Sequence, residues 1–142
     1  MQSEDLKFYE DDEGIAVDLK LKAFGPDEVQ CVNLESELSD KKMKDDILFL
    51  INHQNEFLQK TQKAVHEYCI KIYSQEPSDL KLIKLYIFPD KENEYGFMFS
   101  IKIDSEHGIG VKMINGNIEK IGSSETAFLQ KTFTVNKINK LP

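Results

Sequence analysis

The sequence predicts an α+β domain in which an antiparallel β-sheet is crossed on one face by one long α-helix, bent or broken near its middle. Three observations lead to this fold class. Apolar and polar residues alternate within residues 1–38, one apolar stripe with helical spacing runs through residues 39–74, and alternation returns in residues 80–122. Strands followed by a helix and then by more strands are typical of a sheet that carries its helix on one face.

Residues 1–38 are expected to form acidic N-terminal strands. Leu6–Tyr9 alternates, and from Gly14 onward apolar side chains take the odd positions, as in a half-buried strand. The acidic turn Glu10–Gly14 lies between these segments and allows them to pair as a hairpin. The second strand stops at residues 25–27, Gly-Pro-Asp, and Val29–Leu34 is expected to form a third short strand.

Residues 39–74 are expected to be helical, with Ser39 or Asp40 as the N-cap. The stripe consists of Met43, Ile47, Leu50, Ile51, Leu58, Val65, Tyr68, Cys69 and Ile72. An unbroken helix over the stripe is roughly 50 Å long, whereas a compact domain of this size is roughly 40 Å across. Residues 52–55, Asn-His-Gln-Asn, are its poorest helix formers. We therefore expect a bend or break there, with the second half packed on the sheet as the main helix.

Residues 80–122 are expected to form the rest of the sheet as a meander. Leu82–Phe88 is almost continuously apolar, which indicates a central strand covered on both faces. The next strand directs one apolar face toward the helix, through Tyr95, Phe97, Phe99, Ile101 and Ile103. Ile109, Val111 and Met113 continue the pattern, and Asn115-Gly116 supplies a tight hairpin turn to the strand that carries Ile118 and Ile121.

The 142 residues are expected to form a single domain, 1–142, because the chain has no linker and no internal repeat. Residues 123–142 form its C-terminal tail. Within this tail Thr132–Val135 is a candidate edge strand, and residues 136–142 are expected to be loose.

Charge gives the first indication of function. All 18 basic residues are lysine, and the net charge is −7, so we do not expect nucleic-acid binding. Residues 1–40 hold twelve acids against three lysines, whereas the remainder is close to neutral. Such a region is either a docking surface for a basic protein partner or a solvated face that keeps the protein soluble. The candidate contact residues are Asp11, Asp12, Glu13, Glu35 and Glu37.

Cysteine usage and the N-terminal sequence predict a cytoplasmic protein. Cys31 and Cys69 lie far apart without metal-ligand or CxxC spacing, and the chain starts with an acidic, polar segment. Its longest apolar run, Ile47–Ile51, is far shorter than the roughly 20 residues that cross a bilayer. We therefore expect no membrane association.

The densest cluster of chemically active side chains is Asp104, Glu106 and His107. They could bind a divalent metal or act in acid–base catalysis. The alternative is a structural turn, because the carboxylates can accept backbone hydrogen bonds and Gly108 permits the chain to reverse. The sequence favours the turn, and it predicts no metal, no cofactor and no enzymatic activity.

The other candidates are weaker. The segment Gly108-Ile109-Gly110 leads into a strand and lacks the remainder of a phosphate loop. His53 and His66 are 13 residues apart and fall on different sides of a helix, so they are not expected to share a ligand. Both cysteines are interpreted as small buried apolar residues.

Residues 82–122 resemble a family of small bacterial domains of unknown function that carry a Glu-His-Gly-x-Gly-Val signature. The signature corresponds to Glu106–Val111, and the strand start Tyr95–Phe97 and the closing segment Asn117–Gly122 also fit the family. The helix before them fits the layout of strands, helix and meander. Members of this family look like immunity proteins of polymorphic or contact-dependent toxin systems, and the resemblance assigns no binding residue. The tail after Gly122 departs from the family pattern.

The function expected from these observations is that of an immunity protein, which neutralises a toxin domain by blocking its active site or substrate groove. A basic nuclease is the expected class of toxin. Asp104 and Glu106 form a second contact patch if their turn lies on the same side as the N-terminal acids. The alternatives are a small regulatory or ligand-sensing domain with an unknown ligand and, less favoured, an enzyme that uses Glu106 and His107. The oligomeric state is left open.

Overall fold

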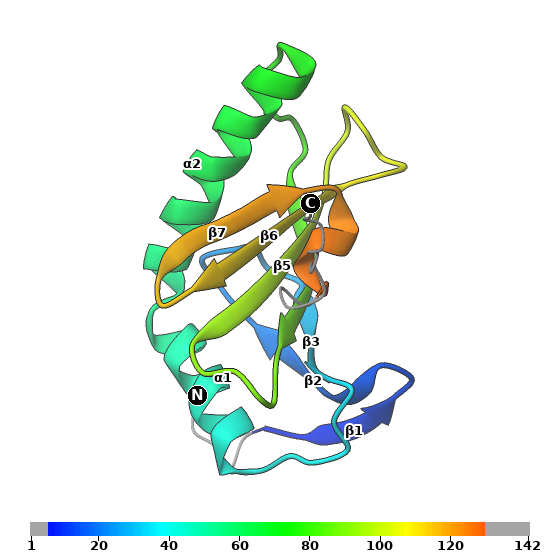
Figure 1. Ribbon diagram of the computed structural model, residues 1–142, viewed down its shortest axis with the longest axis vertical. Helices are drawn as coiled ribbons and strands as arrows, with labels where there is room; N and C mark the ends of the chain where they lie inside the picture. The colour runs from blue at the N-terminus through cyan, green and yellow to red at the C-terminus, as the bar shows by residue number, and fades with distance from the viewer. Residues whose placement is uncertain (1–5, 130–142) are drawn as a thin grey trace, which may run out of the picture.

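The computed structural model describes residues 6–129, and Figure 1 shows the arrangement of their elements. Seven strands form one sheet whose spatial order is the same as their order in the chain. The strands are β1 (Phe8–Asp11), β2 (Gly14–Lys20), β3 (Glu28–Leu34), β4 (Lys81–Ile87), β5 (Glu94–Ser100), β6 (Ile109–Ile114) and β7 (Asn117–Gly122). The helices are α1 (Lys41–Asn52), α2 (Gln54–Tyr73) and a short 3-10 helix, η2 (Ser124–Ala127).

The sheet is mixed, so the expectation of an antiparallel sheet is wrong. Strands β3 and β4 run parallel, with Cys31 opposite Leu85, while every other neighbouring pair is antiparallel. Parallel neighbours require a crossover connection, and α1 with α2 provides it. Figure 1 shows both helices running back along the sheet from the end of β3 to the start of β4.

The helical segment is two helices, so the expectation of one long helix is also wrong. They meet at His53, inside the run where the sequence indicated a bend or break, and His53 has φ −117° and ψ 22°. Its ring stacks on Phe49 with 4.0 Å between centroids. The Gln54 amide donates to the Ile51 carbonyl at 3.0 Å and accepts from the Ala23 N–H at 2.8 Å. Side chains that compete for backbone groups interrupt a helix in this way.

The ends of the helical segment lie close to the expected positions. Asp40 caps α1, because its carboxylate accepts from the Met43 N–H at 3.0 Å. At the other end Ser74 adopts a left-handed conformation with φ 57°, and its N–H bonds back to the Ile70 carbonyl.

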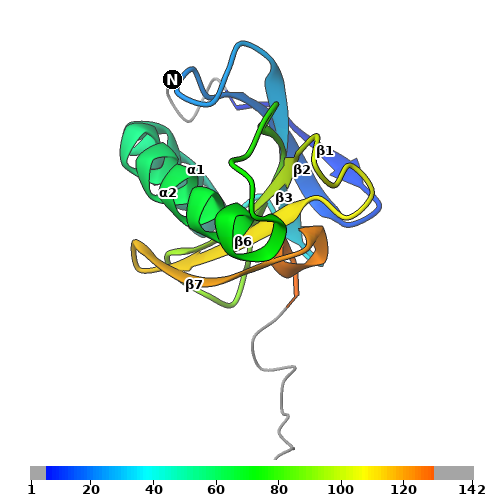
Figure 2. The same ribbon diagram turned by 90° about the horizontal axis from the view of Figure 1, so that it is seen from above.

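The two helices cover one face of the sheet, and η2 covers part of the other (Figure 2). The larger core lies between the sheet and the two helices, where Phe57 of α2 contacts Tyr95 and Phe97 of β5. A smaller core on the opposite face is formed by Ala16, Val32, Tyr86, Phe88 and Ala127. Strand β4 contributes to both cores and is fourth of seven, which confirms it as the central strand.

Helix η2 packs on the sheet where two glycines leave room for it. A Cβ atom on Gly96 would lie 1.7 Å from the Ala127 carbonyl oxygen, and one on Gly110 would lie 2.6 Å from that of Ser124. The second glycine of the Gly108-Ile109-Gly110 segment therefore serves backbone packing. Phe128, directly after η2, then contacts Tyr86 with ring centroids 5.5 Å apart.

Two further expectations concern the ends of elements. Strand β5 ends at Ser100, although Ile101 is buried, so the expected strand up to Ile103 is too long. The proposed edge strand Thr132–Val135 lies outside the described residues. Within residues 6–129, no helix is both long and apolar enough to pass through a membrane.

Candidate functional site

An open hollow of about 670 Å³ lies at the end of the sheet where β1 turns into β2 and β3 ends. We call it the acidic hollow, because all five N-terminal candidate acids line it. The complete lining is Asp11, Asp12, Glu13, Gly14, Leu34, Glu35, Ser36, Glu37, Phe128 and Leu129. Three segments that are distant in sequence therefore meet at one surface.

Backbone hydrogen bonds hold two of these segments together. The Glu35 N–H donates to the Glu13 carbonyl at 2.7 Å, and the Ile15 N–H donates to the Ser36 carbonyl at 2.7 Å. Gly14 makes this contact possible, because a Cβ atom there would lie 2.1 Å from the Asn33 carbonyl oxygen. The β1–β2 turn and the end of β3 thus form one continuous acidic rim.

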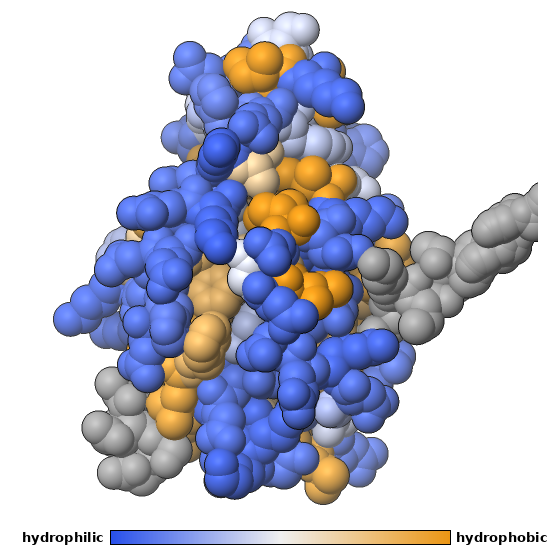
Figure 3. All heavy atoms as spheres, turned by 60° about the vertical axis from the view of Figure 1, so that its left-hand side comes forward, coloured by the Kyte–Doolittle hydropathy of each residue, from blue (hydrophilic) through white to orange (hydrophobic). Residues whose placement is uncertain are grey.

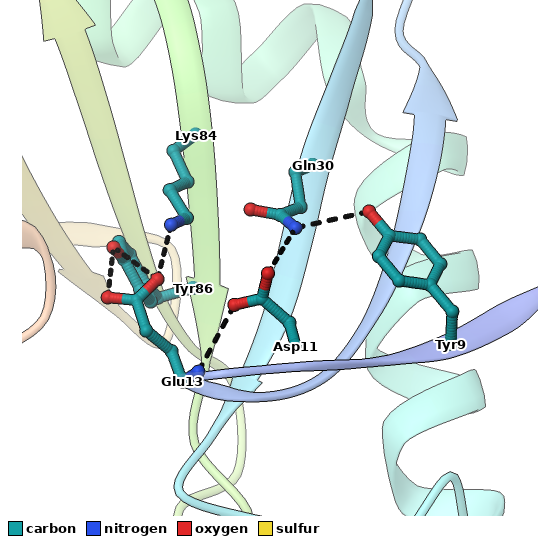
Figure 4. Close-up of polar contacts among 6 residues, drawn as sticks. All are labelled: Tyr9, Asp11, Glu13, Gln30, Lys84 and Tyr86. Carbon is teal, nitrogen blue, oxygen red and sulfur yellow. Dashed lines mark hydrogen bonds and ion pairs between the residues drawn. The ribbon is translucent and has the colours of Figure 1, made fainter.

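Glu13 anchors this rim to the central strand. Figure 4 shows its carboxylate facing Lys84 and Tyr86, which both project from β4. The Lys84 ammonium forms an ion pair with it, and the Tyr86 hydroxyl donates to Oε2 at 3.1 Å. Burial, with the nearby Glu13 charge, raises the pKa of the Tyr86 phenol, so this hydroxyl remains a donor at neutral pH.

Asp11 is fixed by a second network beside the first (Figure 4). Its carboxylate accepts from the Glu13 N–H at 3.1 Å and from the Gln30 amide at 3.1 Å. The same amide nitrogen lies 3.1 Å from the Tyr9 hydroxyl, which itself donates to Asp18 at 2.7 Å. The bonds to Asp11 lower the pKa of its carboxyl group, so Asp11 is ionised at neutral pH.

The remaining three acids, Asp12, Glu35 and Glu37, are exposed. No side-chain hydrogen bond or ion pair from them to another described residue is present. Half-buried Phe128 and exposed Leu129 add an apolar wall to the hollow. This combination of free carboxylates on a rigid rim and an apolar wall suits a Lys- or Arg-bearing protein surface.

Asp104 and Glu106 lie at the opposite end of the sheet from the acidic hollow. Their turn joins the end of β5 to the start of β6, whereas the hollow is next to the end of β3, and the register β3–β4–β5 places these ends apart. The structure therefore does not combine the two acidic patches into one surface.

The Asp104 carboxylate is occupied within its own neighbourhood. It accepts from the His107 N–H at 3.2 Å and the Tyr73 hydroxyl at 2.9 Å, and it lies 2.9 Å from the His107 ring Nδ1. The His107 side chain, through its hydrogen bond to Asp104, lowers the pKa of Asp104, and the same bond raises that of His107. These contacts hold the turn in place, as the structural interpretation expected.

The possible metal ligands and the two cysteine thiols are candidates for a reactive site. Among residues 6–129, no group of three or more His, Cys, Asp or Glu side chains is arranged to hold a metal ion. Cys31 and Cys69 are both buried, and burial raises the pKa of the Cys31 thiol to about 12. A thiol of this kind is a poor nucleophile at neutral pH.

Sequence reasoning missed Lys84, Tyr86 and Gln30, which position the acids. A signal was present, because Lys84 interrupts the otherwise apolar run Leu82–Phe88. A charged residue in a central strand needs a partner, but the sequence does not indicate that Glu13, 71 positions away, provides it. Sequence reasoning also missed Phe128 and Leu129, because the tail around them shows neither strand alternation nor helical spacing.

In comparisons with known proteins, no family model, no curated protein and no solved structure matches this chain.

Proposed function

We propose that this protein binds a basic protein partner through the acidic hollow, and that the partner is a bacterial toxin domain which the bound protein neutralises. The observation that carries the proposal is the convergence of five carboxylates from separate segments on one hollow, with three of them exposed. The identification of the partner as a toxin rests on the family resemblance of residues 82–122.

A basic nuclease is the class of toxin that best fits this surface. Such an enzyme carries lysines and arginines around its substrate groove, because it must hold a polyanion. Asp12, Glu35 and Glu37 can occupy those positions in place of phosphates, and Phe128 and Leu129 can cover apolar surface beside them. The protein thus acts in the cytoplasm as an inhibitor with no catalytic role of its own.

The proposal expects a toxin domain to be encoded by the neighbouring gene, and co-expression with that domain tests it. The wild-type chain should relieve growth arrest, and the variant D12K/E35K/E37K should not, although its thermal unfolding curve stays close to that of the wild type. The matched control, E28K/E76K/E106K, changes the same amount of charge at the other end of the sheet and should still rescue. Equal rescue by both variants would exclude the acidic hollow as the contact site.

The salt dependence of complex formation provides a direct measurement. If exposed carboxylates steer the partner, the association rate should fall steeply between low and physiological salt, while the dissociation rate changes less. The variant D12K/E35K/E37K should lose most of this dependence, and the matched control should keep it.

A second candidate function is that of a small ligand-sensing domain. It is favoured by the volume of the hollow, about 670 Å³, which lies within the range of small-molecule sites. The carboxylates restrict the ligand to a cation such as a polyamine. Thermal-shift measurements with spermidine separate the two functions, since a rise of several degrees without any protein partner would favour the sensor.

A further inference from the structure

A second groove lies on the other side of the molecule, between α2 and β7, and its character is opposite to that of the acidic hollow. It encloses about 560 Å³. Its lining includes the apolar side chains of Ile72, Ile118 and Ile121, while Lys60, Lys63 and Lys71 of α2 form its border with a single acid, Glu67. Figure 3, which brings this side forward, shows apolar side chains lying in a line among hydrophilic ones.

The apolar side chains in the groove are left uncovered by the path of α2. The helix buries Phe57, Val65 and Cys69 against the sheet, and its last turns extend past the end of β7 (Figure 1). Ile72, in the last turn of α2, is 53% exposed, and Ile118, near the start of the edge strand β7, is 37% exposed. Ile72 belongs to the stripe expected to face the core, so its exposure is a departure from the sequence pattern.

The groove runs beside an open sheet edge. Strand β7 is last in the sheet order and pairs only with β6 among residues 6–129. The register pairs Ile118 with Met113 and Ile121 with Val111, which places both isoleucines on the helix side of the sheet. Lys120 is exposed and pairs with Lys112, so it lies on the opposite face.

We propose that an extended, acidic segment of a partner protein binds here by adding a strand to β7. Its alternate side chains would fall on the two faces of the sheet, apolar ones beside Ile118 and Ile121 and acidic ones beside Lys120. Acids at the border of the groove would meet Lys63 and Lys71, which have no ion-pair partner within the described part of the chain.

Charge distinguishes this occupant from the chain's own tail. Residues 130–142 contain three lysines and no acid, so they do not complement a border of lysines. This inference is independent of the toxin proposal, because it concerns another surface and a partner of opposite charge.

The test uses the full chain labelled with ¹⁵N and the peptide Glu-Val-Glu-Val-Glu-Val with blocked ends. The peptide should shift the amide signals of Asn117–Gly122 in a saturable manner. The variant K120E should bind it about tenfold more weakly, whereas K22E, which reverses an exposed lysine elsewhere, should leave the affinity unchanged. A peptide that carries an N-methyl group on every residue should not bind, because it cannot donate the hydrogen bonds of a strand.

Several results would overturn the proposal. One is the absence of shifts in β7 at millimolar peptide, and another is equal binding of Lys-Val-Lys-Val-Lys-Val. Contacts between β7 and residues 130–142 in the free protein would assign the edge to the chain's own tail. Shifts in β7 that follow protein concentration alone would assign it to a second copy.

Discussion

The acidic hollow and the Asp104–His107 turn are both rich in carboxylates, but the structure uses their charges differently. In the turn, the Asp104 carboxylate accepts hydrogen bonds from His107, three positions away, and from Tyr73 on α2. Its charge therefore stabilises the turn. In the hollow, Glu13 and Asp11 fix the rim, and Asp12, Glu35 and Glu37 remain exposed. The density of acids in the sequence therefore does not identify a binding surface; what matters is which carboxylates are left without internal partners.

The strongest way to break the hollow without affecting the turn is to remove the support beneath its apolar wall. Lys112 is buried, forms an ion pair with buried Glu94 at 3.0 Å, and donates to the Leu129 carbonyl at 2.6 Å. The change K112M leaves Glu94 buried without a partner, so it should lower the free energy of unfolding by about 3–5 kcal/mol. Urea denaturation measures this effect.

The control for this change is K120M, directly opposite on β7, where the lysine is exposed. It should alter the stability by less than about 0.5 kcal/mol. The double variant E94Q/K112M should recover part of the loss, because it removes the unpaired charge. If K112M were as stable as the wild type, the buried pair would not support the wall.

A smaller effect is expected from removing Glu13, which joins the rim to β4. The change E13A leaves the Tyr86 hydroxyl and Lys84 without their carboxylate partner, and it should cost about 1–3 kcal/mol of unfolding free energy. D12A, at the adjacent exposed acid, should be nearly neutral. Equal stabilities of E13A and D12A would contradict the anchoring role of Glu13.

The pH dependence of stability separates the acids further. Asp11 has a lowered pKa in the folded protein, chiefly because of the Glu13 N–H and then the Gln30 amide. A carboxyl group of this kind stabilises the fold above its unfolded pKa, near 3.8, and the contribution is lost as pH falls through the lower, folded pKa. D11N should therefore be less stable than the wild type at pH 7, and the difference should vanish in strong acid. Urea midpoints over this pH range provide the measurement.

The smallest effect concerns the turn itself. The Asp104 carboxylate raises the pKa of His107, with a smaller contribution from Glu106. D104N should lower that pKa, and E106Q should lower it less, as followed by the NMR titration of the His107 ring protons. The ion pair stabilises the turn below the unfolded histidine pKa of about 6.5, and this contribution is lost as pH rises through the folded value. A titration unaffected by D104N would mean that the contact does not persist in solution.

The sequence by itself determined the local elements of this protein. Alternation located the strands, the N-cap at Asp40 and the stripe located the helical segment, and the poor helix formers around His53 marked where it is interrupted. These elements could be predicted because the period of a strand or a helix is visible in a short stretch of neighbouring residues. The acidic candidates at residues 11–13 and 35–37 came from the same kind of local observation.

Only the tertiary structure decided which elements become neighbours. The parallel pairing of β3 with β4 follows from a crossover that returns the chain to the end of the sheet at which β3 begins, and no local pattern in either strand indicates it. The same long-range packing brings Glu13 to Lys84, places Phe128 beside the acids, and leaves Ile72 exposed above β7. Charged and apolar side chains form one binding surface only when segments distant in the sequence pack together. Local sequence patterns do not show which segments will do so, because that depends on long-range contacts.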